Sequence, residues 1–471
     1  MFATASRVAK TALAVVFIVR AMSDVASAQP VDVPPTWGGT LLDRPRLTGS
    51  WFGLRDDIGK KGIVLDVDLL QIPQGVITGG TDHVAKYGGL GEYTLNVDTQ
   101  KLGLWPGGFF NIKAMTNFGE NVDQAAGGLI PVNITAVLPE PGKENFTGLM
   151  NLTYMQFLSK YFGVIAGKMY TLSGDDNAFA HDPRSTFLYT GLDFNMVLDL
   201  FPFTAYGGGL AILPWDGAQF TVSVVDPDGT AQNNDISEAF SQGVLVGAEG
   251  RVTVKPFGLV GHQLVGFGWS NKERFKIDQD PANIARLLLT NQFPRLSDPG
   301  PILRRILERF FPQLLVPTQP PSKVNYTWAI YYNFDQYLWS PKGQPDQGIG
   351  IFFRFGASDG VANPVRFAYN VGVGGNGIVP GRPLDSFGIA WARTQLSGNF
   401  VPFLRQQLAL GLEKEDAVEM YYNASITRWL TATLDLEIIS PALKKTLDTA
   451  GQELKNVNTS LVAGLRLSAR F

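Results

Sequence analysis

Apolar and polar residues alternate with a period of two along much of the chain, most clearly near its C-terminus. From Leu461 to Phe471 every second residue is apolar, and the intervening positions include Arg466 and Arg470. Because successive side chains of a β-strand point to opposite faces, this pattern predicts a strand with one apolar and one polar face. Fifteen further segments are read in the same way, near residues 63–77, 92–98, 109–118, 150–160, 163–172, 204–213, 219–224, 246–254, 262–270, 324–338, 349–355, 365–373, 385–395, 418–427 and 430–438.

This many alternating strands favour a membrane barrel over a soluble sandwich. In a transmembrane barrel the outward face meets lipid and the inward face lines water, and closure pairs every backbone group within the hydrocarbon. Strands of about ten residues match a tilted crossing of the bilayer, and no run of about 18 apolar residues offers a spanning helix. The sequence therefore predicts an all-β fold, a transmembrane antiparallel β-barrel of 16 strands, with short helices at the N-terminus and in the extracellular loops.

The connections between the expected strands alternate between short and long. If Phe471 ends in the periplasm, the long connections all fall on the extracellular side, as in known membrane barrels. The early loops 119–149 and 173–203 are expected to fold inward, and the second is rich in polar residues. Within the long loop 271–323, residues 302–311 have the spacing of an amphipathic helix, which is either a lid at the pore mouth or a helix packed on neighbouring loops. The six long connections are 119–149, 173–203, 227–242, 271–323, 396–415 and 439–459, and the polar residues of the second include Asp175, Asp176, His181, Asp182 and Arg184.

The N-terminus has the pattern of an export signal. Basic residues precede an apolar stretch at 11–19, and Ala26-Ser27-Ala28 has the small residues of a cleavage site. The sequence therefore predicts a signal peptide at 1–28, followed by a periplasmic N-terminal segment at 29–62 and the outer-membrane barrel at 63–471. Loss of residues 1–28 removes three basic residues and one acidic residue, which changes the net charge from -3 to -5.

The segment 29–62 is expected to contain one short helix. Ser50 is placed to cap its start, and Gly62 follows its end. Trp51 and Arg55 are candidates for contact with a solute at the lower mouth of the barrel. The alternative is that both side chains pack against the barrel rim.

Composition excludes several classes of site. The chain has no cysteine, so disulfides, thiolate zinc sites and iron–sulfur clusters are excluded. Its three histidines, His83, His181 and His262, are widely separated, and we expect no metal and no cofactor. With 39 basic and 42 acidic residues, the chain offers no general excess of positive charge for nucleic acid.

Charged residues at expected lumen positions are the candidate solute path. A sugar needs a hydrated passage whose donors and acceptors replace part of its hydration water without holding it tightly. The alternative for each residue is that it is only a solvated part of the wall. The candidates are Asp68, Glu92, Lys113, Lys168, Glu249, Arg251, Arg354 and Arg366.

Several motifs resemble the carbohydrate-selective porins of the OprB family. They are LTGSWFGLR at 47–55, DQYLW at 335–339, GIGIFFRFG at 348–356, GIVPGRP at 377–383, and the final strands that end at Phe471. The resemblance covers about residues 45–471. It departs from the family pattern at Phe52, where a glycine is usual, and in the length of loop 271–323. It implies an outer-membrane porin that allows passive, selective diffusion of small sugars.

The resemblance also implies partners and leaves alternatives open. The expected partners are small sugars, outer-membrane lipids and the barrel-assembly machinery, which would recognise the terminal Phe471. Both a monomer and a homo-oligomer remain open. The alternatives are a general non-selective porin, an outer-membrane barrel enzyme of the lipase or protease type, and a secreted sugar-binding or adhesive β protein.

Overall fold

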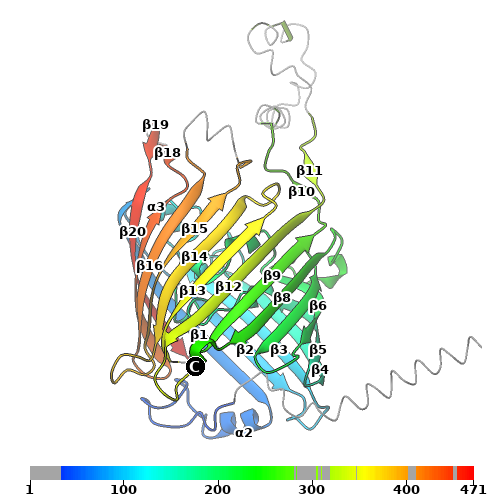
Figure 1. The fold of residues 1–471 in the computed structure, drawn as a ribbon, viewed down its shortest axis with the longest axis vertical. Coiled ribbons are helices and arrows are strands. Elements are labelled where there is room, and N and C mark those ends of the chain that lie inside the picture. The colour runs from blue at the N-terminus through cyan, green and yellow to red at the C-terminus, as the bar shows by residue number, and fades with distance from the viewer. Residues whose placement is uncertain are drawn as a thin grey trace, which may run out of the picture.

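Sixteen antiparallel strands form a closed barrel in the computed structural model, as the alternation predicts (Figure 1). The structure describes residues 33–280, 319–345, 347–400, 410–448 and 453–471, with the single positions 283, 304, 305 and 309. The barrel strands are β1 (Ile63–Gly80), β2 (Ala85–Asp98), β3 (Gly108–Gly119), β4 (Thr147–Ser159), β5 (Phe162–Tyr170), β6 (Thr204–Ile212), β7 (Ala218–Val225), β8 (Leu245–Val254), β9 (Gly261–Ser270), β12 (Thr327–Trp339), β13 (Gly348–Ser358), β14 (Val365–Asn376), β15 (Ser386–Leu396), β16 (Lys414–Ser425), β17 (Leu430–Ser440) and β20 (Asn458–Arg470).

The two faces of the strands follow the sequence alternation. On β17, Leu434 is 66% exposed on the outer surface, whereas Glu437, on the opposite face, is fully buried inside the barrel. The pairing of β1 with β20 closes the wall and brings Leu70 opposite Ser468. Polar side chains on the inner face are therefore enclosed by the barrel.

The two ends of the barrel differ. Short turns and the C-terminus lie at one end, which we call the short-turn end, together with α2 (Leu54–Lys60) (Figure 1). The longer connections lie at the other end, which we call the long-loop end. Two small sheets extend from that end, formed by β10 (Arg274–Phe275) with β11 (Lys323–Val324) and by β18 (Lys445–Asp448) with β19 (Glu453–Asn456).

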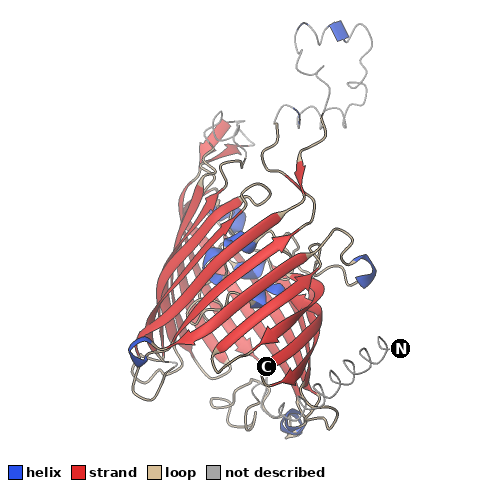
Figure 2. Cartoon of the chain, turned by 45° about the vertical axis from the view of Figure 1, so that its right-hand side comes forward, coloured by secondary structure: helices blue, strands red, loops and turns tan. Residues whose placement is uncertain are grey.

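Two connections fold back into the barrel, as expected for the early loops. Figure 2 shows short helices inside the barrel, behind the strands of the near wall. Loop 120–146 buries Val132 and loop 171–203 buries Phe187, and both belong to a core that includes Leu70 and Leu90 from the barrel wall. The barrel is therefore partly filled by its own loops. The short helices of these two loops are α3 (Asp123–Ala126), η2 (Ile134–Ala136), η3 (Thr171–Ser173), α4 (Thr190–Asp193) and η4 (Met196–Leu198). Two more lie in other connections, η5 (Ile236–Glu238) between β7 and β8 and η6 (Pro256–Gly258) between β8 and β9.

The expected Ser50 cap is wrong. Helix α2 starts at Leu54 with Gly53 in the left-handed region, φ 96°, and no side chain caps it. Ser50 takes part through its carbonyl oxygen, which accepts the backbone N–H groups of Gly53 and Arg55. The chain reaches α2 through a tight turn, and Phe52 within that turn has φ 59°. This backbone conformation favours glycine, although the residue here is phenylalanine.

Two predictions fall outside the described residues. They are the signal peptide at 1–28 and, apart from three isolated positions, the amphipathic helix at 302–311. Within the described part of the chain, no helix is both long and apolar enough to cross a membrane.

Candidate functional site

A chain of six charged side chains lies on the inner face of the barrel, and we call it the charge ladder. Three strands contribute Asp68, Glu92 and Lys113, and loop 171–203 places Arg184 beside them. The Arg184 guanidinium lies 3.3 Å from Asp68 and 3.5 Å from Glu92, and the Lys113 ammonium lies 3.5 Å from Glu92. The ladder is completed by Asp182, at 2.8 Å from Arg184, and Arg470, at 3.9 Å from Asp68.

The ladder balances its charges. It contains three acids and three bases, and Arg184 links three of the carboxylates. Burial opposes ionisation of Asp182, but the adjacent Arg184 outweighs burial and lowers the pKa of Asp182 below its ordinary value. The same Asp182 carboxylate raises the pKa of Arg184. Both groups therefore stay charged at neutral pH and offer donors and acceptors side by side.

Arg354, a predicted path residue, fastens loop 171–203 to the wall. Its guanidinium donates to the carbonyl oxygens of Leu192, at 2.8 Å, and Asp175, at 3.0 Å, and also to that of Ala180. Glu249 acts on the same loop, because its carboxylate accepts the Asp175 N–H at 2.8 Å. Both side chains face inward as expected, but both bind groups of loop 171–203.

Two further glutamates hold loop backbone in the same way. Glu419 accepts the N–H groups of Leu188 and Tyr189, at 2.7 and 2.9 Å. Glu415 accepts those of Leu129 and Ile130, at 2.8 and 3.0 Å. The period-two pattern places Glu419 on the polar face of its strand, whereas Glu415, expected in the connection 396–415, lies on β16 in the structure. Their loop partners are more than 200 residues away in the chain, so that the pattern gives no sign of them.

Lys168 does not face the lumen, so its predicted place in the solute path is wrong. It pairs across the sheet with Leu152 and Tyr206, and Leu152 is 42% exposed on the outer face of the barrel. The ammonium donates to the carbonyl oxygens of Thr230 and Asn233, at 2.8 and 2.9 Å. The connection between β7 and β8 thus covers Lys168 on the outer face of the barrel. A charged residue in a strand therefore does not by itself indicate a position in the lumen.

The other candidates are spread along the barrel. Arg251 faces the lumen and pairs with Asp176 of loop 171–203 at 3.2 Å. Arg366 lies at the long-loop end, where its guanidinium donates to the Ser358 carbonyl oxygen and lies over the Phe367 ring. Neither residue joins the charge ladder.

The remaining two candidates lie at the short-turn end. Arg55 is 1% exposed and donates to the Phe471 and Leu65 carbonyl oxygens, at 3.0 and 2.6 Å. Its guanidinium also lies over the rings of Trp37 and Trp51, at 5.3 and 5.0 Å. In the structure Arg55 joins the N-terminal segment to the last residue of the chain.

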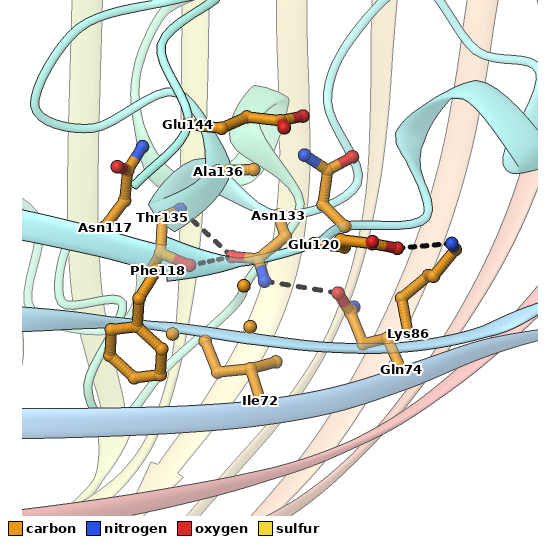
Figure 3. A pocket seen from close by; sticks show the side chains of 14 residues that line it. Ile72, Gln74, Lys86, Asn117, Phe118, Glu120, Asn133, Thr135, Ala136 and Glu144 are labelled. Carbon is orange, nitrogen blue, oxygen red and sulfur yellow. Dashed lines mark hydrogen bonds and ion pairs between the residues drawn. The ribbon is translucent and has the colours of Figure 1, made fainter. Parts of the chain in front are cut away.

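A small pocket with polar and apolar side chains lies between loop 120–146 and the wall of β1 to β3 (Figure 3). Across it, Asn133 donates to the Gln74 side-chain oxygen at 3.2 Å, and Thr135 donates to the Asn133 oxygen. Lys86 and Glu120 form a close ion pair at its edge. Loop 120–146 is therefore held to the wall by side-chain hydrogen bonds in addition to apolar packing.

Comparison with known proteins identifies the family. The model of the carbohydrate-selective porin, OprB family, matches residues 82–471. The chain belongs to this family. A structure of Pseudomonas putida OprB at high pH matches it with a TM-score of 0.72 and 19% identity, over 91% of this chain and 99% of that one. A low-pH structure of the same protein has a TM-score of 0.54 and 15% identity over the same shares. No curated protein matched the chain.

The closed barrel agrees with membership of this family. The protein is a carbohydrate-selective porin of the bacterial outer membrane, and both family and fold indicate a channel rather than an enzyme. Among the described residues, no group of three or more acidic or histidine side chains is placed to hold a metal ion.

Proposed function

We propose that small neutral sugars cross this porin by passive diffusion along the charge ladder. The balanced arrangement of three acids and three bases, joined through Arg184, carries this proposal. A sugar hydroxyl both donates and accepts hydrogen bonds, so alternating carboxylates and cations replace its hydration water on successive steps. A ladder without net charge gives neither cations nor anions a general advantage.

Loop 171–203 sets the width of the path in this proposal. It contributes Asp182 and Arg184 to the ladder, and Arg354 fastens its backbone to the opposite wall. Because the loop is anchored on several strands, the passage keeps one width instead of opening with the motion of a free loop. We expect the entry rate of sugars to fall steeply with their size.

The orientation of the protein in the membrane and its other partners are part of the same proposal. The long-loop end faces the cell exterior, the outer face contacts outer-membrane lipid, and the barrel-assembly machinery recognises the C-terminal strand. Phe471 supports the last point, because its N–H donates to the Val67 carbonyl oxygen and so extends the closure of the barrel.

Swelling of liposomes that contain the purified protein tests this function. The solutes are a mono-, a di- and a trisaccharide, beside anionic and cationic solutes of matched size. Fast entry of the monosaccharide with a steep fall in rate for larger sugars supports the proposal. Equal rates for all solutes of one size indicate a general porin instead, and no swelling above that of empty liposomes rejects an open channel.

A further inference from the structure

A second compartment lies inside the barrel, on the side of β5 to β9, and we call it the apolar bay. It comprises about 1360 Å³, including space open to solvent, between the inner face of these strands and loop 171–203. None of the six ladder residues lines it. The bay is thus part of the lumen, but its surface differs from that of the charged path.

Small residues on the wall leave this space open. Gly209, Gly247 and Gly268 occupy inner-face positions of β6, β8 and β9. A Cβ atom on Gly247 would meet only the Ser223 hydroxyl, at 3.1 Å. At Gly268 the loop fills the available space, because a Cβ atom there would lie 2.7 Å from the Phe201 ring. The bay therefore remains open above Gly247.

The surface of the bay is mainly apolar, and its polar side chains come from β7, from loop 171–203 and from Glu249 and Tyr331. Ile165 and Met169 line it from the wall, and Phe194 and Leu198 line it from the loop. Tyr331 donates to the Glu249 carboxylate at 2.7 Å, and both groups also line the bay. A cavity that combines apolar walls with a few fixed polar groups is the usual form of a small-molecule site.

A free sugar gains little from such a wall, because hydroxyl groups cover most of its surface. A solute with an aromatic ring gains more, because the ring packs on phenylalanine edges and on the flexible, polarisable methionine side chain. The same solute still needs polar partners for its sugar part, and Glu249 and Tyr331 supply a carboxylate and a hydroxyl.

We propose that the apolar bay binds the aromatic aglycone of small glycosides while they cross the channel, with the sugar part near Glu249 and Tyr331. The inference rests on the proposed sugar passage, and it adds aryl glycosides to the solutes that the porin admits. An aryl glycoside then resides longer in the channel than an alkyl glycoside with the same sugar.

Single-channel recording in planar bilayers tests this inference. Phenyl β-glucoside and methyl β-glucoside are added to the wild-type protein, and their affinities are taken from the interruptions of the ion current. We expect phenyl β-glucoside to bind about tenfold more tightly. Gly247→Phe, which places a ring in the open part of the bay, should abolish this difference, and Gly247→Ala, which adds only a methyl group, should retain it. Met169→Gln has nearly the same volume, and it should weaken the binding of phenyl β-glucoside alone.

Each outcome decides the inference. Equal affinity for the two glucosides in the wild type overturns it, and so does a preference for the phenyl compound that survives both Gly247→Phe and Met169→Gln. Heat-dependent gel mobility identifies variants that fail to fold. If only one of Gly247→Phe and Met169→Gln folds, the result with that variant decides the inference. Swelling with glucose tests the sugar passage separately. If swelling fails, the current interruptions still decide whether the bay binds the ring.

Discussion

Arg354 on β13 and Asp175 in loop 171–203 form an ion pair of 2.9 Å, with side-chain exposures of 1% and 2%. The Arg354 guanidinium also donates to the carbonyl oxygens of Asp175 and Leu192. These contacts join residues that are 179 and 162 positions apart in the chain. The position of loop 171–203 therefore depends on a few buried contacts with the barrel wall.

Arg354→Met should loosen loop 171–203. The substitution leaves Asp175 buried without its cation, which typically costs about 3–5 kcal/mol. We expect a larger single-channel conductance and a weaker dependence of swelling rate on sugar size. The double variant Arg354→Met with Asp175→Asn removes the unpaired charge and should recover part of the stability. An unchanged conductance and size dependence in the folded single variant would contradict this role.

Arg184→Gln should make the channel prefer cations. The ladder then contains three acids and two bases, so its net charge becomes negative, and we expect the ratio of potassium to chloride permeability to rise about threefold. The reversal potential in a potassium chloride gradient at pH 8 measures this ratio. Arg184→Lys keeps the charge and should behave like the wild type. A reversal potential that responds equally to both substitutions would argue against charge balance.

Lys113 and Lys168 offer a paired test of which face each side chain occupies. Lys113 joins the ladder, whereas Lys168 lies on the outer face under the connection between β7 and β8. Lys113→Gln should therefore increase cation preference, and Lys168→Gln should leave the reversal potential unchanged. A shift of similar size in both variants would place Lys168 in the lumen, against the register of β5.

Asp123 should make the packing of loop 120–146 dependent on pH. Burial raises its pKa to about 7, although its carboxylate accepts the Val132 N–H at 3.0 Å. The folded loop holds the proton more tightly than the unfolded chain, whose ordinary value is 3.8. Stability should therefore fall as the pH rises from about 4 to about 7 and then level off.

Asp123→Asn removes this titration. Protease cleavage within residues 120–146 should be similar in wild type and variant at pH 4. At pH 8 cleavage should be several-fold slower in the variant, because the wild type then carries a buried charge. Asp57→Asn is a suitable control, since the Asp57 side chain is 72% exposed. Cleavage of Asp123→Asn that keeps the pH dependence of the wild type would show that another group is responsible.

Arg55→Ala should weaken the closure of the barrel. Arg55 donates to the carbonyl oxygen of Phe471, and hydrogen bonds from charged donors contribute about 1.5–3 kcal/mol. The temperature at which gel mobility changes should fall by several degrees. Lys60→Ala alters the same segment at a side chain that is 70% exposed and should have no such effect. Equal transition temperatures in the two variants would contradict a closing role.

The barrel and its two faces could be read from the sequence because period-two alternation is a local property. A strand places Glu419 and Glu437 on the polar face wherever its neighbours lie, and the register then sets them opposite each other. Seven of the eight lumen candidates face the expected side of the barrel wall or lie at its rim. Lys168 is the exception, because a lysine on the outer face is acceptable once loop oxygens bind its ammonium.

Only the tertiary structure decided which inward groups hold a loop and which join the charge ladder. Glu419 binds the backbone of Leu188 and Tyr189, and Arg354 binds that of Leu192. No sequence spacing announces such contacts, because they form between segments that approach only when the loops enter the closed barrel. The sequence by itself determined the strands, their polar faces and the family of the protein. The charge ladder and the apolar bay depend on loop placement, which is set by long-range packing and hydrogen bonding.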